Sequence, residues 1–117
     1  LDSDTLNLNI DTDSIPAPPY DYIVFLGVFE YLEQPRTASM KIAEATNGII
    51  ATYCCRDETM DILDIEGVRR KRGWITDFSK YEFLALFRVC GFEVVGEHTF
   101  NRADDFEQFV FHLKRIV

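Results

Sequence analysis

Two short apolar runs, with a helix-like segment between them, constrain the fold of this chain more than any other feature. Tyr22–Leu26 is apolar throughout, and Ile49–Cys54 is rich in β-branched residues. Runs of this kind are typical of strands that are buried on both faces of a sheet. Pro35 suits the first turn of the helix between them, and Asn47-Gly48 is expected to end it with a positive φ. Strand, helix and strand in this order predict parallel strands of an α/β sheet.

The neighbouring segments extend this pattern in both directions. Leu6–Ile10 alternates apolar and polar residues as a half-buried strand does, and a proline-rich loop follows it. After the second apolar run, Cys55–Phe78 is predicted to be a long irregular loop with one helical turn near residues 58–63. A loop of this length in a compact domain is more often functional than idle.

A capping box at Ser79–Glu82 predicts a second helix, because the serine oxygen and the glutamate carboxylate each accept a backbone N–H of the first turn. Gly91 is expected to end this helix. Residues 92–100 and 107–114 then form two strands, most simply an antiparallel hairpin. We therefore predict one α/β domain over residues 1–117, with parallel strands and a C-terminal antiparallel hairpin. The apolar stripe of the second helix is Phe83, Leu84, Phe87 and Cys90.

The charges of the chain disfavour nucleic acid and anionic membranes as partners. Twelve basic and twenty acidic residues give a net charge of −8, which repels polyanions. The basic run Arg69–Arg72 departs from this trend. We expect a solvated loop there, with a local anion or substrate contact as the alternative. No apolar run reaches the ~20 residues of a membrane helix.

The cysteines and histidines give no sign of a metal site. Cys54, Cys55 and Cys90 are an odd number of thiols without metal-ligand spacing. A reducing cytoplasm is the simplest location for such a chain. His98 and His112 lie in the predicted hairpin, and we expect both to be structural.

Glycine and polar residues follow the predicted strand ends. Gly27–Tyr31 comes after the first apolar run, Cys55-Arg56 after the second, and Asp11 and Asp13 after Leu6–Ile10. The carboxyl ends of parallel strands form the rim where open α/β sheets bind ligands. Each residue alone has a local explanation as a turn residue, a strand stop or a first-turn acid. Together they predict one binding rim.

The stretch Asp11–Pro35 resembles the second half of a class I S-adenosylmethionine-dependent methyltransferase. That family often shows an acid, a Leu-Pro pair, an aromatic-Asp pair, a buried strand and a Val-x-Glu-His-Leu-like segment. Here Tyr20-Asp21 matches the aromatic-Asp pair, and Glu30-Tyr31-Leu32 matches the Glu-His-Leu segment. Further on, NGIIATYC resembles the next strand, and FSKYEFLALFRVCGFEVV resembles the following helix and its Gly-Phe-x-Val strand. The resemblance implies a partial Rossmann-like methyltransferase sheet from Asp11 to about Lys114.

The resemblance also implies roles for the rim residues. Asp11 falls where the family's acid contacts the adenine of the cofactor, and Leu26–Val28 falls beside the cofactor's methionine portion. With Asp13 and Glu30, these residues are the predicted S-adenosylmethionine contacts. Tyr31, which stands where the family more usually has His, is a predicted substrate contact. The other two predicted substrate contacts are Arg56 and Trp74, and Trp74 has a loop-anchoring hydrophobic contact as its alternative.

The sequence departs from the family in what it lacks. The family's Gly-rich turn, roughly GxGxG, finds no match among the six glycines, and the chain begins about where the family's third strand begins. We therefore expect weak or no cofactor binding by this chain alone, and methyl transfer to an unknown acceptor only with the missing half. The alternative is a non-catalytic, methyltransferase-like assembly module. A third class, an enzyme that uses Asp or Glu as general acid and base, has weak support, because no pair of carboxylates in this sequence has a spacing that requires it.

Removal of the first two strands would expose an apolar edge at Tyr22–Leu26. We expect this edge to pair with a second copy, with a missing N-terminal segment or with a partner chain. Alternatively, the Leu6–Ile10 strand pairs with it directly.

Overall fold

The fold is a four-stranded mixed sheet with helices on one face. The computed structural model describes residues 21–56, 62–101 and 107–116, with the side chains of 62–66, 100, 101 and 107 excepted. The strand order is β1-β2-β4-β3, with β1 parallel to β2 and both other pairs antiparallel. This arrangement confirms the predicted α/β class and the C-terminal hairpin. The strands are β1 Ile23–Phe25, β2 Gly48–Cys54, β3 Phe92–Asn101 and β4 Glu107–Arg115.

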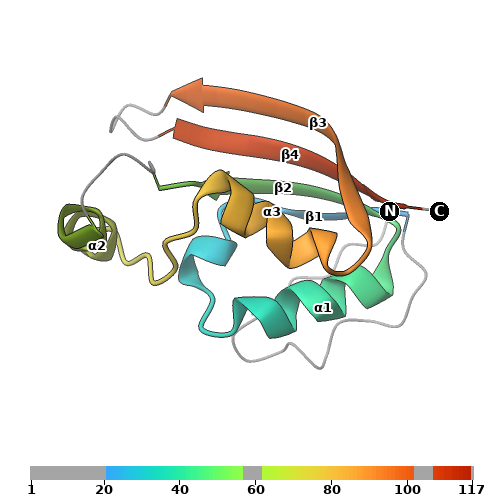
Figure 1. Ribbon diagram of the computed structural model, residues 1–117, viewed down its shortest axis with the longest axis horizontal. Helices are drawn as coiled ribbons and strands as arrows, with labels where there is room; N and C mark the ends of the chain where they lie inside the picture. The colour runs from blue at the N-terminus through green and yellow to red at the C-terminus, as the bar shows by residue number, and fades with distance from the viewer. Residues whose placement is uncertain (1–20, 57–61, 102–106, 117) are drawn as a thin grey trace.

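Two helices cover the same side of the sheet, and a third lies beyond the end of β2 (Figure 1). The covering helices are α1, Pro35–Ala45, and α3, Lys80–Arg88. The outlying helix is α2, Ile62–Lys71, and a short 3-10 helix, η2, spans Phe29–Tyr31. The carboxyl ends of β1 and β2 therefore open toward η2 and α2.

An aromatic cluster fills the space between the sheet and its helices. Phe83 of α3 stacks on Tyr53 of β2, with ring centroids 4.5 Å apart, and contacts Phe111 of β4 at 5.6 Å. Phe29 of η2 contacts Phe83 edge to face at 5.6 Å and Phe25 of β1 at 4.8 Å. These rings are buried and bring η2, α3 and three strands into one core.

The local signals for α1 and α3 are confirmed. Pro35 lies in the first turn of α1. The Ser79 side chain accepts the Glu82 backbone N–H, and the Glu82 carboxylate accepts the Ser79 N–H, which completes the capping box. Gly91 takes φ +88° at the end of α3. The predicted strand Leu6–Ile10 and the proline-rich loop after it lie outside the described residues.

Two predictions about the first strand and helix are wrong. Val24 is 55% exposed whereas its neighbour Phe25 is 6% exposed, so β1 is buried on one face only. α1 ends at Thr46 in an extended conformation, and Gly48 begins β2 without a positive φ. The close approach of a ring explains this glycine, because a Cβ there would lie 2.6 Å from Cε1 of Tyr22.

The predicted loop Cys55–Phe78 is also wrong in part, since ten of its residues form α2. Three residues of the basic run, Arg69, Arg70 and Lys71, form the last turn of this helix and not a solvated loop. Arg69 is 1% exposed. Cations near a helix C-terminus interact favourably with the helix dipole, but a fully buried one needs partners of its own.

Candidate functional site

The rim lies at the carboxyl end of β1, which stops three residues before its neighbour β2. The last register pair of β1 and β2 is Phe25 with Ala51. Gly27 then adopts φ +64°, a left-handed conformation that favours glycine, and turns the chain into η2. Its N–H donates to Oγ1 of Thr52 at 2.7 Å, which fixes the turn against β2. Leu26 is consequently exposed and Gly27 partly exposed at the rim.

Glu30 joins the rim to the end of β2. Its side chain is 2% exposed, and Oε2 accepts the backbone N–H of Cys54 at 2.8 Å. Its backbone carbonyl accepts the N–H groups of Ile75 and Thr76 at 2.7 and 3.3 Å. Oε1 has no hydrogen-bond partner among the described residues. The carboxylate thus lies inside the molecule, and one of its oxygens retains its full capacity to accept.

Arg69 binds the other backbone group of Cys54. Its Nη1 donates to the carbonyl of Cys54 at 2.7 Å. Its Nη2 donates to the carbonyl of Thr76 at 2.9 Å and to the Tyr53 hydroxyl at 3.2 Å. Nε lies 2.9 Å from Oδ1 of Asp77. A guanidinium in a dry interior requires such partners, and this set connects α2, the end of β2 and the segment 74–77, hereafter the strap.

Burial suppresses the acidity of two groups beside Arg69. Burial raises the pKa of Tyr53 to about 12, and its hydroxyl bonds Oγ1 of Thr76 at 2.8 Å and accepts the N–H of Phe78 at 3.0 Å. Burial likewise raises the pKa of the Cys55 thiol to about 12. Because the thiolate is the nucleophilic form of cysteine, Cys55 is inert at neutral pH.

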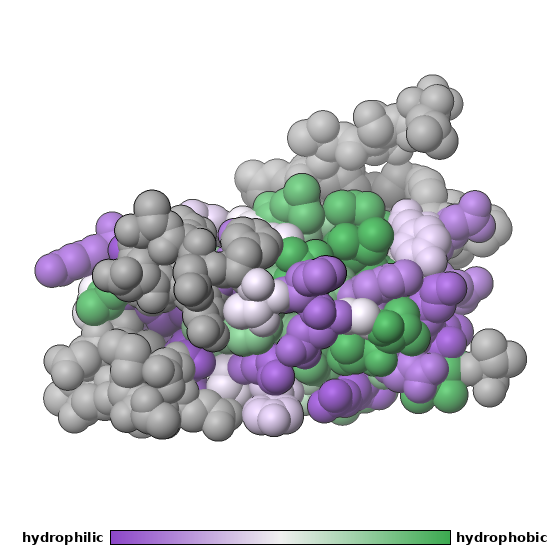
Figure 2. Space-filling view, turned by 90° about the horizontal axis from the view of Figure 1, so that it is seen from above, coloured by the Kyte–Doolittle hydropathy of each residue, from purple (hydrophilic) through white to green (hydrophobic). Residues whose placement is uncertain are grey.

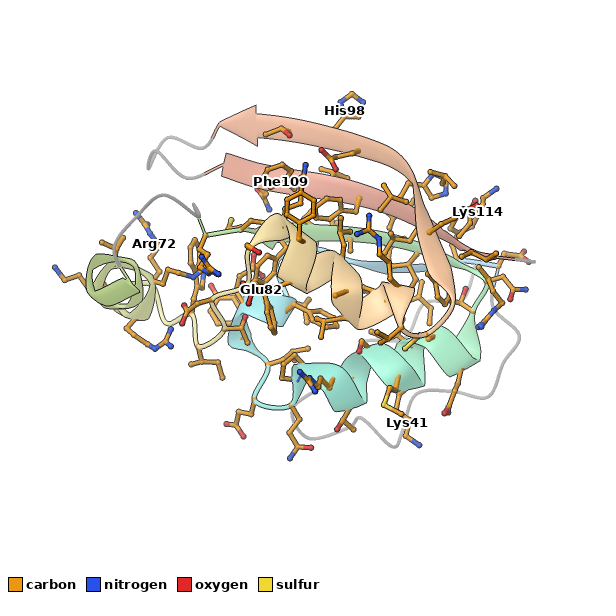
Figure 3. All side chains as sticks on the ribbon, viewed as in Figure 1. Lys41, Arg72, Glu82, His98, Phe109 and Lys114 are labelled. Carbon is orange, nitrogen blue, oxygen red and sulfur yellow. The ribbon has the colours of Figure 1, made fainter. Side chains whose placement is uncertain are left out.

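Trp74 anchors the strap. It is 3% exposed, and its indole lies against the guanidinium groups of Arg69 and Arg72 at 4.9 and 5.7 Å. Figure 3 shows Arg72 beside α2, at the end of the molecule where the rim lies. Indole Nε1 donates to the hydroxyl of Tyr31 at 3.2 Å, and Tyr31 is 45% exposed. The ring of Trp74 therefore packs inward, and Tyr31 presents the accessible aromatic surface.

Arg56 connects the rim to the start of α3. Its Nε donates to the carbonyl of Asp77 at 3.0 Å, and Nη2 pairs with Glu82 at 2.7 Å. The pKa of Glu82 is lowered, chiefly by its hydrogen bond from the Ser79 backbone N–H and further by Arg56. Arg56 is a quarter exposed, so part of its surface faces solvent.

The structure brings together most of the predicted site residues. Glu30 and Tyr31 in η2 meet Trp74 and the strap through the contacts above, at the ends of β1 and β2. Asp11 and Asp13 lie outside the described residues. The sequence interpretation missed Arg69 together with its partners Tyr53, Thr76 and Asp77. The only available signal was the run of basic residues followed by an acid.

Other parts of the described structure lie away from the rim. A cavity of about 460 Å³ lies between α1 and α3, lined in part by Arg36, Met40 and Val89. His112 Nε2 is 3.2 Å from the Tyr22 hydroxyl on the sheet, and His98 points away from the helices in Figure 3. Among the described residues, no cluster of three His, Cys, Asp or Glu could hold a metal ion. None of the described helices is long and apolar enough to cross a membrane.

Comparison with solved structures places the fold. The chain is similar to the [4+2]-cyclase SpnF, with a TM-score of 0.71 and 14% identity over 92% of this chain and 56% of that chain. It is also similar to a possible histamine N-methyltransferase from Thermotoga maritima, with a TM-score of 0.64 and 16% identity over 90% of this chain and 61% of that chain. A third similar structure is magnesium protoporphyrin IX methyltransferase from Synechocystis, solved with bound S-adenosylhomocysteine. Its TM-score is 0.66, with 12% identity over 91% of this chain and 49% of that chain. The chain has the fold of about half of the domain that S-adenosylmethionine-dependent methyltransferases share.

Identities of this size establish the fold and leave function to the site. The chain spans about half the length of the structures it matches. No protein-family model and no curated protein matches the sequence.

Proposed function

We propose that this chain forms part of the S-adenosylmethionine site of a methyltransferase that acts on an acceptor still to be identified. The observation that supports this most directly is the rim itself. In the methyltransferase fold described above, the residues that resemble the family's cofactor segment, Leu26–Val28, follow the end of a parallel strand and remain accessible. Ligands of open α/β sheets bind at this position.

The residues present fit part of such a cofactor. A Cβ added at Gly27 would meet nothing within 4 Å, so the backbone there can be approached closely. Oε1 of Glu30 is a buried acceptor without a partner among the described residues, and it suits a cationic or donor group. Asp11 and Asp13 complete the proposed set of acids around a sulfonium. The bound cofactor would supply an electrophilic methyl group, and the chain's contribution is to orient it.

The acceptor would lie on the side of Tyr31. Its ring is half-exposed, and the indole N–H of Trp74 fixes the position of its hydroxyl. Trp74 and Arg56, which hold the strap and the start of α3, support this surface from behind. The fold alone does not fix the reaction class, because SpnF is a [4+2]-cyclase; the cofactor segment of the sequence favours methyl transfer.

The proposed site is incomplete in this chain. Without a GxGxG turn, we expect weak binding of the cofactor and no turnover by this chain alone. We further propose that it is a cytoplasmic, single-domain segment that associates with itself or with an N-terminal segment, since β1 is at one end of the described strand order and edge strands invite pairing.

Titration of the isotope-labelled chain with S-adenosylhomocysteine tests the cofactor site. We expect millimolar affinity, with amide shifts concentrated at Leu26, Gly27 and Val28. Leu26→Glu should weaken binding at least several-fold, whereas Val89→Glu, at an 83% exposed position on the helix side, should leave it unchanged. Shifts confined to other surfaces would overturn the proposed site, and micromolar affinity would overturn its incompleteness.

A further inference from the structure

One face of the sheet, here called the open face, carries no helix in the described part of the chain. α1 and α3 lie together against the opposite face (Figure 1), where Phe25, Phe111 and Leu113 belong to the core. Because side chains alternate along a strand, the residues between these core positions point to the open face. The register places across it the rows Val24–Ile50–His112 and Thr52–Val110–His98.

The open face is apolar and accessible along its β1 side. Tyr22 and Val24 are 42% and 55% exposed, and Ile50 and Val110 are half-buried. Figure 2 views the molecule from the side opposite α1 and shows hydrophobic side chains gathered near the middle, among hydrophilic ones. A parallel pair of strands is normally covered on both faces, and an apolar patch of this kind marks a contact surface.

Among the side chains that the structure describes, the open face carries little negative charge, although the chain has twenty acidic residues. Two strand acids have described side chains, Glu93 and Glu97. Glu97 pairs with Lys80 of α3 at 3.3 Å, on the helix side. Glu93 is at the corner of the open face, in register with Lys114. Of the described strand acids, only Glu93 lies on this face, so two such faces can meet with little repulsion between them despite a net charge of −8.

We propose that a second copy of the chain packs on this face, sheet against sheet, about a two-fold axis. A self-complementary, apolar and nearly neutral surface is what such an isologous contact requires, and stacked sheets of this kind lie about 10 Å apart. The inference names a surface for the self-association proposed above, and it needs no cofactor. Failure of the S-adenosylhomocysteine titration would therefore leave it standing.

The size of the face sets the strength of the contact. Four strands at a spacing of about 4.8 Å, with seven residues in β2 at about 3.3 Å each, cover roughly 450 Å² per copy. The total of roughly 900 Å² lies below the range of stable specific interfaces and among those of weak or transient complexes. We therefore expect a reversible dimer that forms in the micromolar range and dissociates on dilution.

Val110 separates this contact from pairing at the β1 edge, because β4 is an inner strand and its side chains can only act through the face. Sedimentation and light scattering over micromolar to millimolar protein should show a dimer for the wild type and for the matched control Val89→Lys. Val110→Lys should remain monomeric. Val110→Thr, which keeps the β-branched shape and tests the contact if the lysine variant misfolds, should weaken the dimer about tenfold.

Two results would overturn the proposal. A wild-type chain that remains monomeric at all concentrations lacks the contact. A dimer that is unaffected by both Val110 substitutions, with circular dichroism showing that each variant is folded, uses the β1 edge or another surface.

Discussion

Replacement of Arg69 by alanine is the perturbation that best tests this account of the rim. The side chain is 1% exposed and donates to the carbonyls of Cys54 and Thr76, to the Tyr53 hydroxyl and to Asp77. If these bonds hold the strap and α2 on the end of β2, the substitution should cost far more than loss of a surface charge.

The magnitude follows from what would be left unpaired. Two buried carbonyl oxygens would lose a charged donor, at about 1–3 kcal/mol each. Breaking a buried ion pair costs about 3–5 kcal/mol, but Asp77 is 20% exposed and keeps Arg70 at 2.7 Å, which reduces this contribution. We expect a loss of about 4 kcal/mol, against a total stability of ~5–15 kcal/mol for a typical domain.

Urea unfolding measures this loss with two independent signals. Circular dichroism follows the whole fold, and the fluorescence of Trp74, the chain's one tryptophan, follows the strap. If the strap alone detaches, Trp74 emission should shift to the red before the fold unfolds. Lys71→Ala, at an exposed position two residues away, is the matched control. A difference of less than about 1 kcal/mol between the two variants, with Trp74 emission unchanged, would refute the reasoning.

Two further predictions concern titratable groups. The pKa of Glu82 is lowered in the fold. Its carboxylate therefore stabilises the fold at pH values above its ordinary pKa of 4.5. This contribution is lost as the pH falls through the pKa of the folded state. Glu82→Gln should flatten the acid side of the stability profile, and parallel profiles would contradict the assignment. A thiol reagent at neutral pH should modify the half-buried Cys90 first. Cys54 and Cys55 should react only after unfolding, so three rapidly reacting thiols would contradict their burial.

Sequence patterns succeeded where the controlling chemistry is local. The capping box at Ser79–Glu82 was predictable because both bonds join residues three apart. The need for glycine at position 48 was not predictable, since it arises from the ring of Tyr22, which is distant in sequence. The apolar content of β1 gave its parallel pairing correctly, but pattern alone could not show that one face would lack a covering helix in the described part of the chain.

The basic run Arg69–Arg72 shows a more general reason for failure. Four consecutive charges can all be solvated in a loop, and this is their common arrangement. In a helix, successive side chains are about 100° apart, so Arg69, Arg70 and Lys71, in the last turn of α2, point in three different directions. Arg69 faces inward, while Arg70 is nearly half-exposed. To predict α2 from the sequence, one would have had to identify Asp77 as the ion-pair partner of Arg69.

The buried charged residues Glu30 and Arg69 therefore have a structural role, because they form the floor of the rim, beneath its accessible residues. Glu30 accepts the N–H of Cys54 and Arg69 donates to the carbonyl of Cys54, so the two side chains pair both backbone groups of a β2 residue that lies beyond the last register pair with β1. Charge-assisted bonds of this kind are about twice as strong as neutral ones. They fix η2 and the strap to β2 and leave Leu26–Val28 and Tyr31 as the accessible members. A ligand at this rim would accordingly meet backbone and apolar surface first, and the buried Oε1 of Glu30 is the one charged oxygen of the described floor whose hydrogen bonding it could complete.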